Sequence, residues 1–297
     1  MFIDTHCHID SYEEHSGETL DVLLERLAEA SKIAHEQNRD TLVTGNSPAS
    51  APWSISKATS PDSNLRMPEA FIHVACDPKD FERGKELSEK YANIYTAYGI
   101  HPEYVLSENE EDERKLVEYL KHPKCVACGE FGLDYHYGAD TRLEQMKLFE
   151  RHLQIGLESK KPLVLHLREA DEDALGILRN ADIQGTNIHV HCFTGSPEFC
   201  AQILDLKSQG ANIFVGFTGI VTFKNAQNVR DAAALVPLDQ ILLETDAPYM
   251  SPQPQRGTPC HSGFIPYIAY ALAQVKQVSI KEIYKKCREN TRHCYGI

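Results

Sequence analysis

The sequence predicts an α/β fold in which eight parallel strands close into a (β/α)8 TIM barrel that forms a single domain. Three observations lead to this prediction. Short apolar runs alternate with amphipathic stretches along the whole chain, eight such runs can be counted, and 297 residues suit a barrel of eight units. An open doubly wound sheet is the alternative arrangement of the same elements.

The strand-like runs are apolar, and helical stretches follow them. The first helical stretch is clear, because Leu20, Leu23 and Leu27 recur three or four positions apart. Strands joined by helices imply a parallel sheet with right-handed crossovers. The predicted strands cover 2–5, 70–75, 94–100, 125–129, 162–165, 188–190, 211–216 and 240–245, and the predicted helices cover 18–37, 81–91, 112–121, 141–159, 171–180, 197–209 and 229–235.

Residues 46–68 interrupt this alternation. They are rich in Ser, Pro, Ala and Asn, a composition typical of an exposed loop with little capacity to form a core. We interpret this stretch as an insertion within a single domain that spans 1–297, and not as a linker between two domains.

The net charge of −13 excludes a broad basic surface of the kind that binds nucleic acid without regard to its sequence. Any phosphate chemistry must therefore be local. Bound divalent cations are one way to place positive charge inside an acidic protein.

The cysteine pattern and the N-terminus indicate the compartment. The nine cysteines are odd in number and scattered, which favours free thiols in a reducing environment. We see neither a signal peptide nor an apolar run long enough to span a membrane. We therefore expect a cytoplasmic protein, with the nucleus as a further location, that is a monomer or a weak homo-oligomer.

Residues that can bind metals stand at the ends of the predicted strands. His6 and His8 end the first strand, and their spacing of two places both imidazoles on the same side of an extended chain. Because the loops after parallel strands gather at one face of a barrel, we expect the other strand-end residues to join this pair. They are His101, Glu130, His166, His191 and Asp246.

Each of these residues also has a structural interpretation, since His101 could cap the turn before Pro102 and Asp246 could begin a turn before Pro248. Taken together, however, they predict a metal centre. Without His101, six ligands remain, namely four histidines, Glu130 and Asp246. They are too many for one open catalytic ion and suit two divalent ions bridged by a carboxylate. Glu130, on a middle strand, is the natural bridge.

The predicted ligand sets follow from the order of the strands. His6, His8 and Asp246 hold one ion, and His166 and His191 hold the other. Imidazole and carboxylate ligands admit Zn²⁺, Mn²⁺, Co²⁺ or Mg²⁺ without choosing among them.

Beyond these residues, the sequence resembles the TatD-type metal-dependent deoxyribonucleases of the amidohydrolase-like barrel superfamily over nearly its whole length. The motifs that carry the resemblance are Ile3-Asp4-Thr5-His6-Cys7-His8, Gly99-Ile100-His101-Pro102, Gly129-Glu130-Phe131-Gly132-Leu133-Asp134-Tyr135, Leu165-His166-Leu167-Arg168-Glu169-Ala170, His191-Cys192-Phe193-Thr194-Gly195, Glu244-Thr245-Asp246-Ala247-Pro248-Tyr249 and Glu289-Asn290-Thr291-Arg292.

The resemblance implies a deoxyribonuclease, and it places the family's substrate-side histidine on His101. The family's metal ligands fall on the set already selected from the strand ends: His6, His8, Glu130, His166, His191 and Asp246. The implied substrate is single-stranded or damaged DNA, cleaved by a 3′–5′ exonuclease or by a repair-type endonuclease.

The expected mechanism is hydrolysis of a phosphodiester by a water that two metal ions activate. Asp246 would orient this water or accept its proton. His101 and Arg168 would contact phosphate oxygens, with further hydrogen bonds from Thr194 and Gly195. Arg168 could instead pair with a neighbouring carboxylate, that of Glu169 or Asp171.

Two other functions compete with this one. The same barrel and the opening histidine pair serve amidohydrolases that act on cyclic amides, lactones or organophosphates. Such sites often use a modified lysine as the bridge on the fourth strand, where this chain has Glu130. A non-catalytic metal-binding or scaffold role is the third interpretation, and it predicts ions whose coordination positions are all filled by protein.

Overall fold

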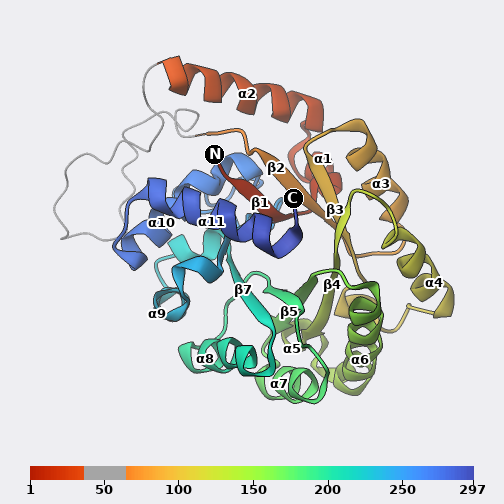
Figure 1. Ribbon diagram of the computed structural model, residues 1–297. Coiled ribbons are helices and arrows are strands. Elements are labelled where there is room, and N and C mark those ends of the chain that lie inside the picture. Colours follow the sequence, from red (N-terminus) through yellow and green to blue (C-terminus); the bar gives the residue numbers. More distant parts are fainter. Residues whose placement is uncertain (37–64) are drawn as a thin grey trace.

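Eight parallel strands pair in the order in which they occur along the chain, in a computed structural model that describes residues 1–36 and 65–297 (Figure 1). The strands are β1 (Ile3–Cys7), β2 (Ala70–Ala75), β3 (Ile94–Tyr98), β4 (Cys125–Asp134), β5 (Leu163–Arg168), β6 (Asn187–Val190), β7 (Asn212–Phe217) and β8 (Ile241–Leu243).

The last strand returns to the first and closes the barrel. Cys7 and Ala247 form a parallel bridge, and the backbone nitrogen of His8 donates to the carbonyl oxygen of Ala247 at 2.7 Å. The Thr5 hydroxyl donates to the carbonyl oxygen of Leu243 at 3.1 Å. The predicted (β/α)8 barrel is confirmed, and the open doubly wound sheet is wrong.

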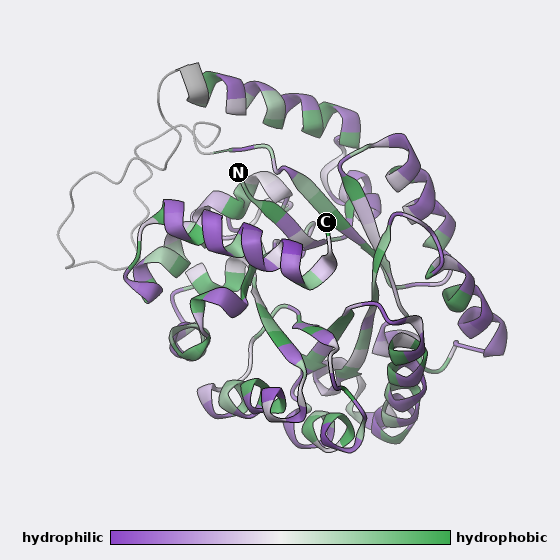
Figure 2. Cartoon of the chain, in the orientation of Figure 1, coloured by the Kyte–Doolittle hydropathy of each residue, from purple (hydrophilic) through white to green (hydrophobic). Residues whose placement is uncertain are grey.

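Helices surround this barrel, and Figure 2 shows that they carry most of the hydrophilic residues of the regular elements, interspersed with hydrophobic ones. The helices are α1 (Ile9–Ser16), α2 (Leu20–Glu36), α3 (Phe81–Lys90), α4 (Glu110–Tyr119), α5 (Tyr135–Gly138), α6 (Arg142–Ser159), α7 (Asp171–Asn180), α8 (Pro197–Asp205), α9 (Gln227–Leu235), α10 (Ile265–Lys276) and α11 (Ile280–Tyr295).

The barrel interior is a packed core, not a pore. Inward-facing residues such as Ile72, Val164 and Leu242 form one buried cluster with Cys294 and Tyr295 at the end of α11. The C-terminal helix therefore contributes to the barrel core, and in Figure 1 it crosses in front of the strands. This packing leaves the opposite, carboxyl end of the strands for the site.

Three strands run two or more residues further than the sequence predicted, and the first of them is β1, which continues through His6 to Cys7. β4 continues through Glu130 to Asp134, and β5 continues through His166 to Arg168, so both metal-ligand candidates lie within strands and not after them. Gly129 makes this possible. Its φ is 142°, and a Cβ atom there would lie 2.4 Å from the Val164 carbonyl oxygen, so only glycine permits this approach of β4 to β5.

Several helices differ from the prediction. The predicted helix 18–37 begins at Leu20, and residue 37 lies outside the described residues. The helices α1, α10 and α11 were not predicted. Most residues of α10 are buried, so it lacks the polar face on which an amphipathic pattern depends.

Only residues 65–68 of the proposed 46–68 insertion are described, and the remainder lies outside the described residues. The described end is not an exposed loop. Leu65 is buried in a cluster with Leu23 and Leu27, and the backbone nitrogen of Met67 donates to the Ser31 hydroxyl at 2.7 Å. This end of the segment is thus anchored to α2.

All nine cysteines are free. None of the helices in the two described ranges is long and apolar enough to cross a membrane.

Candidate metal centre

The two histidines at the start of the chain converge at the carboxyl end of the barrel. His6 lies in β1 and His8 directly follows it, with their Nε2 atoms 3.3 Å apart. The Nδ1 atom of His8 lies 2.9 Å from the Val74 carbonyl oxygen, so in the neutral ring this nitrogen carries the proton and donates it. The Nε2 lone pair of His8 is therefore directed toward the centre for a metal ion.

Glu130 lies between two groups of histidines. Its Oε2 atom is 3.0 Å from His6 Nε2, whereas its Oε1 atom is 2.8 Å from His166 Nδ1 and 3.2 Å from His191 Nε2. The residue is only 3% exposed. Each carboxylate oxygen thus faces different histidines, which is the arrangement that a carboxylate needs to bridge two ions.

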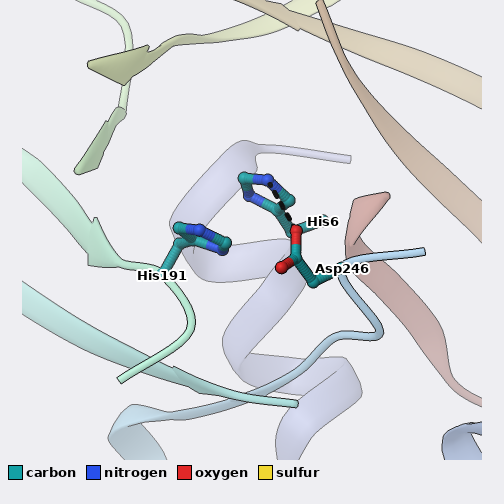
Figure 3. A group of neighbouring side chains, drawn as sticks. All are labelled: His6, His191 and Asp246. Atoms are coloured by element: carbon teal, nitrogen blue, oxygen red, sulfur yellow. Dashed lines mark ion pairs between the residues drawn. The ribbon is translucent and has the colours of Figure 1, made fainter. Parts of the chain in front are cut away.

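Asp246 faces the opening histidine pair. Its Oδ1 atom is 3.5 Å from His8 Nε2 and 3.8 Å from His6 Nε2. The backbone nitrogen of Asp246 donates to the His6 carbonyl oxygen at 2.9 Å, so the closure of the barrel sets its position. Donor atoms of His6, His191 and Asp246 lie within 4.8 Å of one another, and Figure 3 shows these side chains gathered around one region.

His101 lies beside Glu130 but presents a hydrogen-bond donor. Its Nδ1 atom accepts from the backbone nitrogen of Glu103 at 3.2 Å, so the proton of the neutral ring is on Nε2, which lies 3.7 Å from Glu130 Oε1. Burial, together with the nearby His166, lowers the pKa of His101 to about 3. A neutral ring that carries its proton on Nε2 can donate to a substrate oxygen, which supports a substrate-side role.

A carboxylate that the sequence analysis did not select supports His166. The Oδ2 atom of Asp134 lies 2.9 Å from His166 Nε2, on the side of the ring away from Glu130. Such outer carboxylates fix the orientation of a ligand imidazole and raise its basicity. An even spacing from Glu130 along one strand places Asp134 on the same side, and this signal could have identified it.

Glu244 has a similar position behind His191 and was also missed. Its Oε1 atom lies 3.7 Å from His191 Nδ1, and its Oε2 atom lies 2.9 Å from His189 Nε2. All three residues are buried. Glu244 stands two residues before Asp246, but its contact with His191 depends on the pairing of distant strands and has no local signal.

Replacing Asp134 with asparagine is expected to reduce metal affinity or kcat/KM by about 10- to 100-fold, because His166 loses a charged orienting partner. Asparagine keeps a side-chain oxygen for the backbone nitrogen of Tyr137, which Asp134 Oδ1 accepts at 3.0 Å. The measurement is a metal titration followed through activity. Asp140→Asn, in the short turn Ala139–Thr141, is the matched control. Equal metal affinity in all three proteins would contradict the role of Asp134.

The donor set fits divalent metal ions. Burial raises the pKa of Glu130, but His191 and His6 outweigh this effect and hold the pKa well below its usual value, so the side chain is anionic. Glu130 Oε2 and the Nδ1 atoms of His6 and His191 are buried without a hydrogen-bond partner among the described residues. A buried anionic carboxylate is costly unless a cation lies beside it. Imidazole and carboxylate ligands together suit Mg²⁺, Mn²⁺ or Zn²⁺.

A cavity of about 440 Å³ adjoins the centre, and Arg168, Thr194 and Gly195 line it together with His166, His191 and Asp246. Asn228 holds this wall, because its Nδ2 atom donates to the carbonyl oxygens of Thr194 and Gly195 at 3.0 and 3.4 Å. The structure thus brings together all six ligand candidates and places the three phosphate-binding candidates next to them.

Arg168 does not pair with its neighbouring carboxylates. Glu169, considered as its partner, instead pairs with His136 at 2.7 Å. The guanidinium carbon of Arg168 lies 4.9 Å from the centre of the Tyr137 ring. Across residues 1–36 and 65–297, no ion pair within 4.0 Å holds Arg168, so its charge is available to an anionic ligand in the cavity.

The chain is similar in sequence to known proteins. The uncharacterized metal-dependent hydrolase YcfH of Escherichia coli is 32% identical over 303 residues, which cover 100% of this chain and 96% of that protein. The human 3′–5′ RNA nuclease TATDN2 is 40% identical over 208 residues, or 69% of this chain. This match spans only 27% of the human protein.

Solved structures show the same barrel. The TatD homologue YJJV from Escherichia coli superposes with a TM-score of 0.78 at 25% identity, covering 100% of this chain and 98% of that one. A TatD family hydrolase from Entamoeba histolytica superposes with a TM-score of 0.72 at 20% identity, covering 99% of this chain and 97% of that one, and supports the fold.

A closed barrel that gathers histidines and carboxylates at the carboxyl ends of its strands defines the class of metal-dependent hydrolases. Within this class, the chain belongs to the TatD related DNase family, which it matches over residues 3–296.

Proposed function

We propose that this protein is a two-metal phosphodiesterase that cleaves DNA. The observation that carries this proposal is the position of Glu130, whose two oxygens face two different sets of histidines. One ion would be held through Glu130 Oε2 and the other through Glu130 Oε1. His6, His8 and Asp246 would be the remaining ligands of the first ion, and His166 and His191 those of the second.

Two Mg²⁺, Mn²⁺ or Zn²⁺ ions in such a site would supply Lewis-acid stabilisation and an activated water. Asp246 would orient this water or accept its proton. Burial raises the pKa of Asp246, but His8 and other histidines outweigh this and lower it below its usual value, so the carboxylate is ionised. His101 donates from Nε2 to a phosphate oxygen, and Arg168 offsets the negative charge of the phosphate.

Arg168 favours a phosphodiester over a neutral cyclic amide or lactone. A protein with a net charge of −13 repels anions in general, yet within residues 1–36 and 65–297 it places an arginine without a carboxylate partner in the cavity beside the candidate metal centre. An anionic substrate needs this local positive charge, whereas an uncharged amide does not. Glu130 at the bridging position also differs from the modified lysine that many amidohydrolases use.

We assign single-stranded or damaged DNA as the substrate, cleaved by a 3′–5′ exonuclease or a repair-type endonuclease. The family description names a DNase, whereas the human relative is described as an RNA nuclease, so RNA is the competing substrate. A nuclease would recognise RNA through the 2′-hydroxyl, and matched DNA and RNA strands of one sequence separate the two substrates.

The direct test uses purified protein and end-labelled single strands of DNA and RNA, with and without a chelator. We expect faster cleavage of DNA, loss of cleavage in EDTA, and recovery when Mg²⁺, Mn²⁺ or Zn²⁺ is added in excess. Label at the 3′ end distinguishes exonuclease from endonuclease products. Cleavage that persists after complete metal removal, or hydrolysis of cyclic amides and lactones with no cleavage of oligonucleotides, would contradict the proposal.

A further inference from the structure

Two exposed tyrosines stand beside the candidate metal centre. Among the described residues, Tyr137 and Tyr249 are the only phenylalanine, tyrosine or tryptophan side chains that are clearly exposed, at 79% and 45%. Single exposed apolar residues are ordinary on protein surfaces. Here, however, both exposed tyrosines lie against side chains of the candidate site: Tyr249 against His8 and Tyr137 against Arg168.

Tyr249 adjoins the opening histidine pair. Its backbone nitrogen donates to the Asp246 carbonyl oxygen at 2.8 Å, which fixes the start of its side chain. Its ring lies edge to face with His8 at 6.2 Å between ring centres and with His15 at 5.3 Å. The ring is therefore held at the rim, next to a ligand of the first ion.

Tyr137 adjoins Arg168, which lines the cavity beside the candidate metal centre. It lies in α5, directly after β4, and its backbone nitrogen donates to Asp134 Oδ1 at 3.0 Å. The guanidinium carbon of Arg168 lies 4.9 Å from the centre of its ring, and the His136 ring packs edge to face at 4.6 Å. Arg168 thus connects this exposed ring to the cavity beside the second ion.

The strand order places the two rings on opposite sides of the centre. Tyr249 follows β8, which adjoins β1, whereas Tyr137 follows β4, which pairs with β5. In a ring of eight strands that pair in sequence, these two positions face each other across the barrel. The metal-ligand candidates lie between them.

We propose that Tyr137 and Tyr249 are stacking platforms for two nucleobases that flank the scissile phosphate of a single strand. The inference rests on the proposed phosphodiesterase function and names how that substrate is held. Aromatic rings stack on any base, and such contacts are typical of proteins that bind single strands without sequence preference. Bases within a duplex are already stacked and paired, so these platforms would select single strands.

The test compares Tyr137→Ala and Tyr249→Ala with the conservative variants Tyr137→Phe and Tyr249→Phe. For a short single-stranded DNA, we expect each alanine variant to raise KM by about 5- to 100-fold with kcat nearly unchanged. The phenylalanine variants keep a stacking ring and should resemble the original protein. Leu235→Ala, an exposed apolar residue at the end of α9, is a control away from the rim.

A second substrate separates stacking from a structural role. The same DNA strand with abasic residues on both sides of the scissile phosphate has no base to stack, so the alanine variants should cleave it as the original protein does. Equal loss on both substrates would show a structural effect and overturn the inference. Unchanged KM on the normal strand would also overturn it.

Binding measurements keep this inference separate from the proposed function. Fluorescence anisotropy with a labelled oligothymidine and Glu130→Gln protein reports binding without cleavage, and each Tyr→Ala change should weaken it about 5- to 100-fold. If the original protein binds the strand through these tyrosines but cleaves nothing, the stacking inference is supported and the phosphodiesterase proposal is wrong. If it cleaves DNA but the tyrosine variants bind normally, only the platforms fail.

Discussion

Replacing Glu130 with glutamine is expected to lower kcat/KM for DNA cleavage by about 1,000-fold, because one side chain serves both ions. Its two oxygens lie 3.0 Å from His6 and 2.8 Å from His166, so the neutral amide weakens both halves of the centre at once. Metal analysis after dialysis should show two ions per chain in the original protein and at most one in the variant.

The matched control for this change is Glu172→Gln, an exposed carboxylate on α7 that does not adjoin the candidate metal centre. This variant should keep both ions and full activity. Near-normal cleavage by Glu130→Gln, with two ions still bound, would rule out Glu130 as the bridge. Circular dichroism of the variant establishes that the barrel has folded, so that lost activity reflects the site.

Metal affinity is expected to fall by at least about 100-fold between pH 8 and pH 6, because a bound ion must displace a proton from His166. Burial alone would lower the pKa of His166, but Asp134 and Glu130 outweigh it and raise the pKa to about 9 in the absence of metal. Below pH 9 the ring is therefore mostly protonated. Each further pH unit lowers the apparent affinity about tenfold for one displaced proton.

The raised pKa of His166 also affects the stability of the metal-free protein. Stability decreases as the pH rises, whereas metal affinity increases. The raised pKa means that the protonated ring stabilises the fold fully below the unfolded pKa of about 6.5, and this contribution is lost as the pH rises through about 9.

The protons that metal binding releases can be measured directly, by calorimetric metal titrations in buffers of different ionisation enthalpy.

Asp134→Asn provides the control for the pH dependence. Removing this carboxylate lowers the pKa of His166, so the decline in metal affinity should begin at a lower pH than in the original protein. A metal affinity that stays constant from pH 6 to pH 8 in the original protein would show that His166 releases no proton when the metal binds.

The barrel was predictable because its signals are local and repeated. The strand Ala70–Ala75 and the helix Asp171–Asn180 have the bounds that the periodicity predicted. The ends of β4 and β5 were misplaced because Gly129 resembles a strand terminus in the sequence, whereas close pairing with Val164 keeps the chain extended. α10 was missed because burial on most sides removes its polar face.

Among the side chains of the candidate site, the ligands were easier to predict than their partners. Histidine and carboxylate side chains after apolar runs are chemically distinctive, so His6, His8 and Asp246 could be selected as members of one recurring pattern at the strand ends. Glu244 is equally acidic, yet nothing local shows that it lies behind His191. Arg168 likewise had nearby carboxylates as alternatives, and only the pairing of Glu169 with His136 removes one of them.

From the sequence alone we could predict the barrel, its eight strands and six residues that could bind metal, because periodicity and residue chemistry act over a few positions. The folded barrel was needed to see that Glu130 faces two sets of histidines, that Asp134 and Glu244 lie behind them, and that two exposed tyrosines stand on opposite sides of the candidate metal centre. These are distances between side chains on different strands. They depend on the register and closure of the whole barrel, which no local pattern specifies.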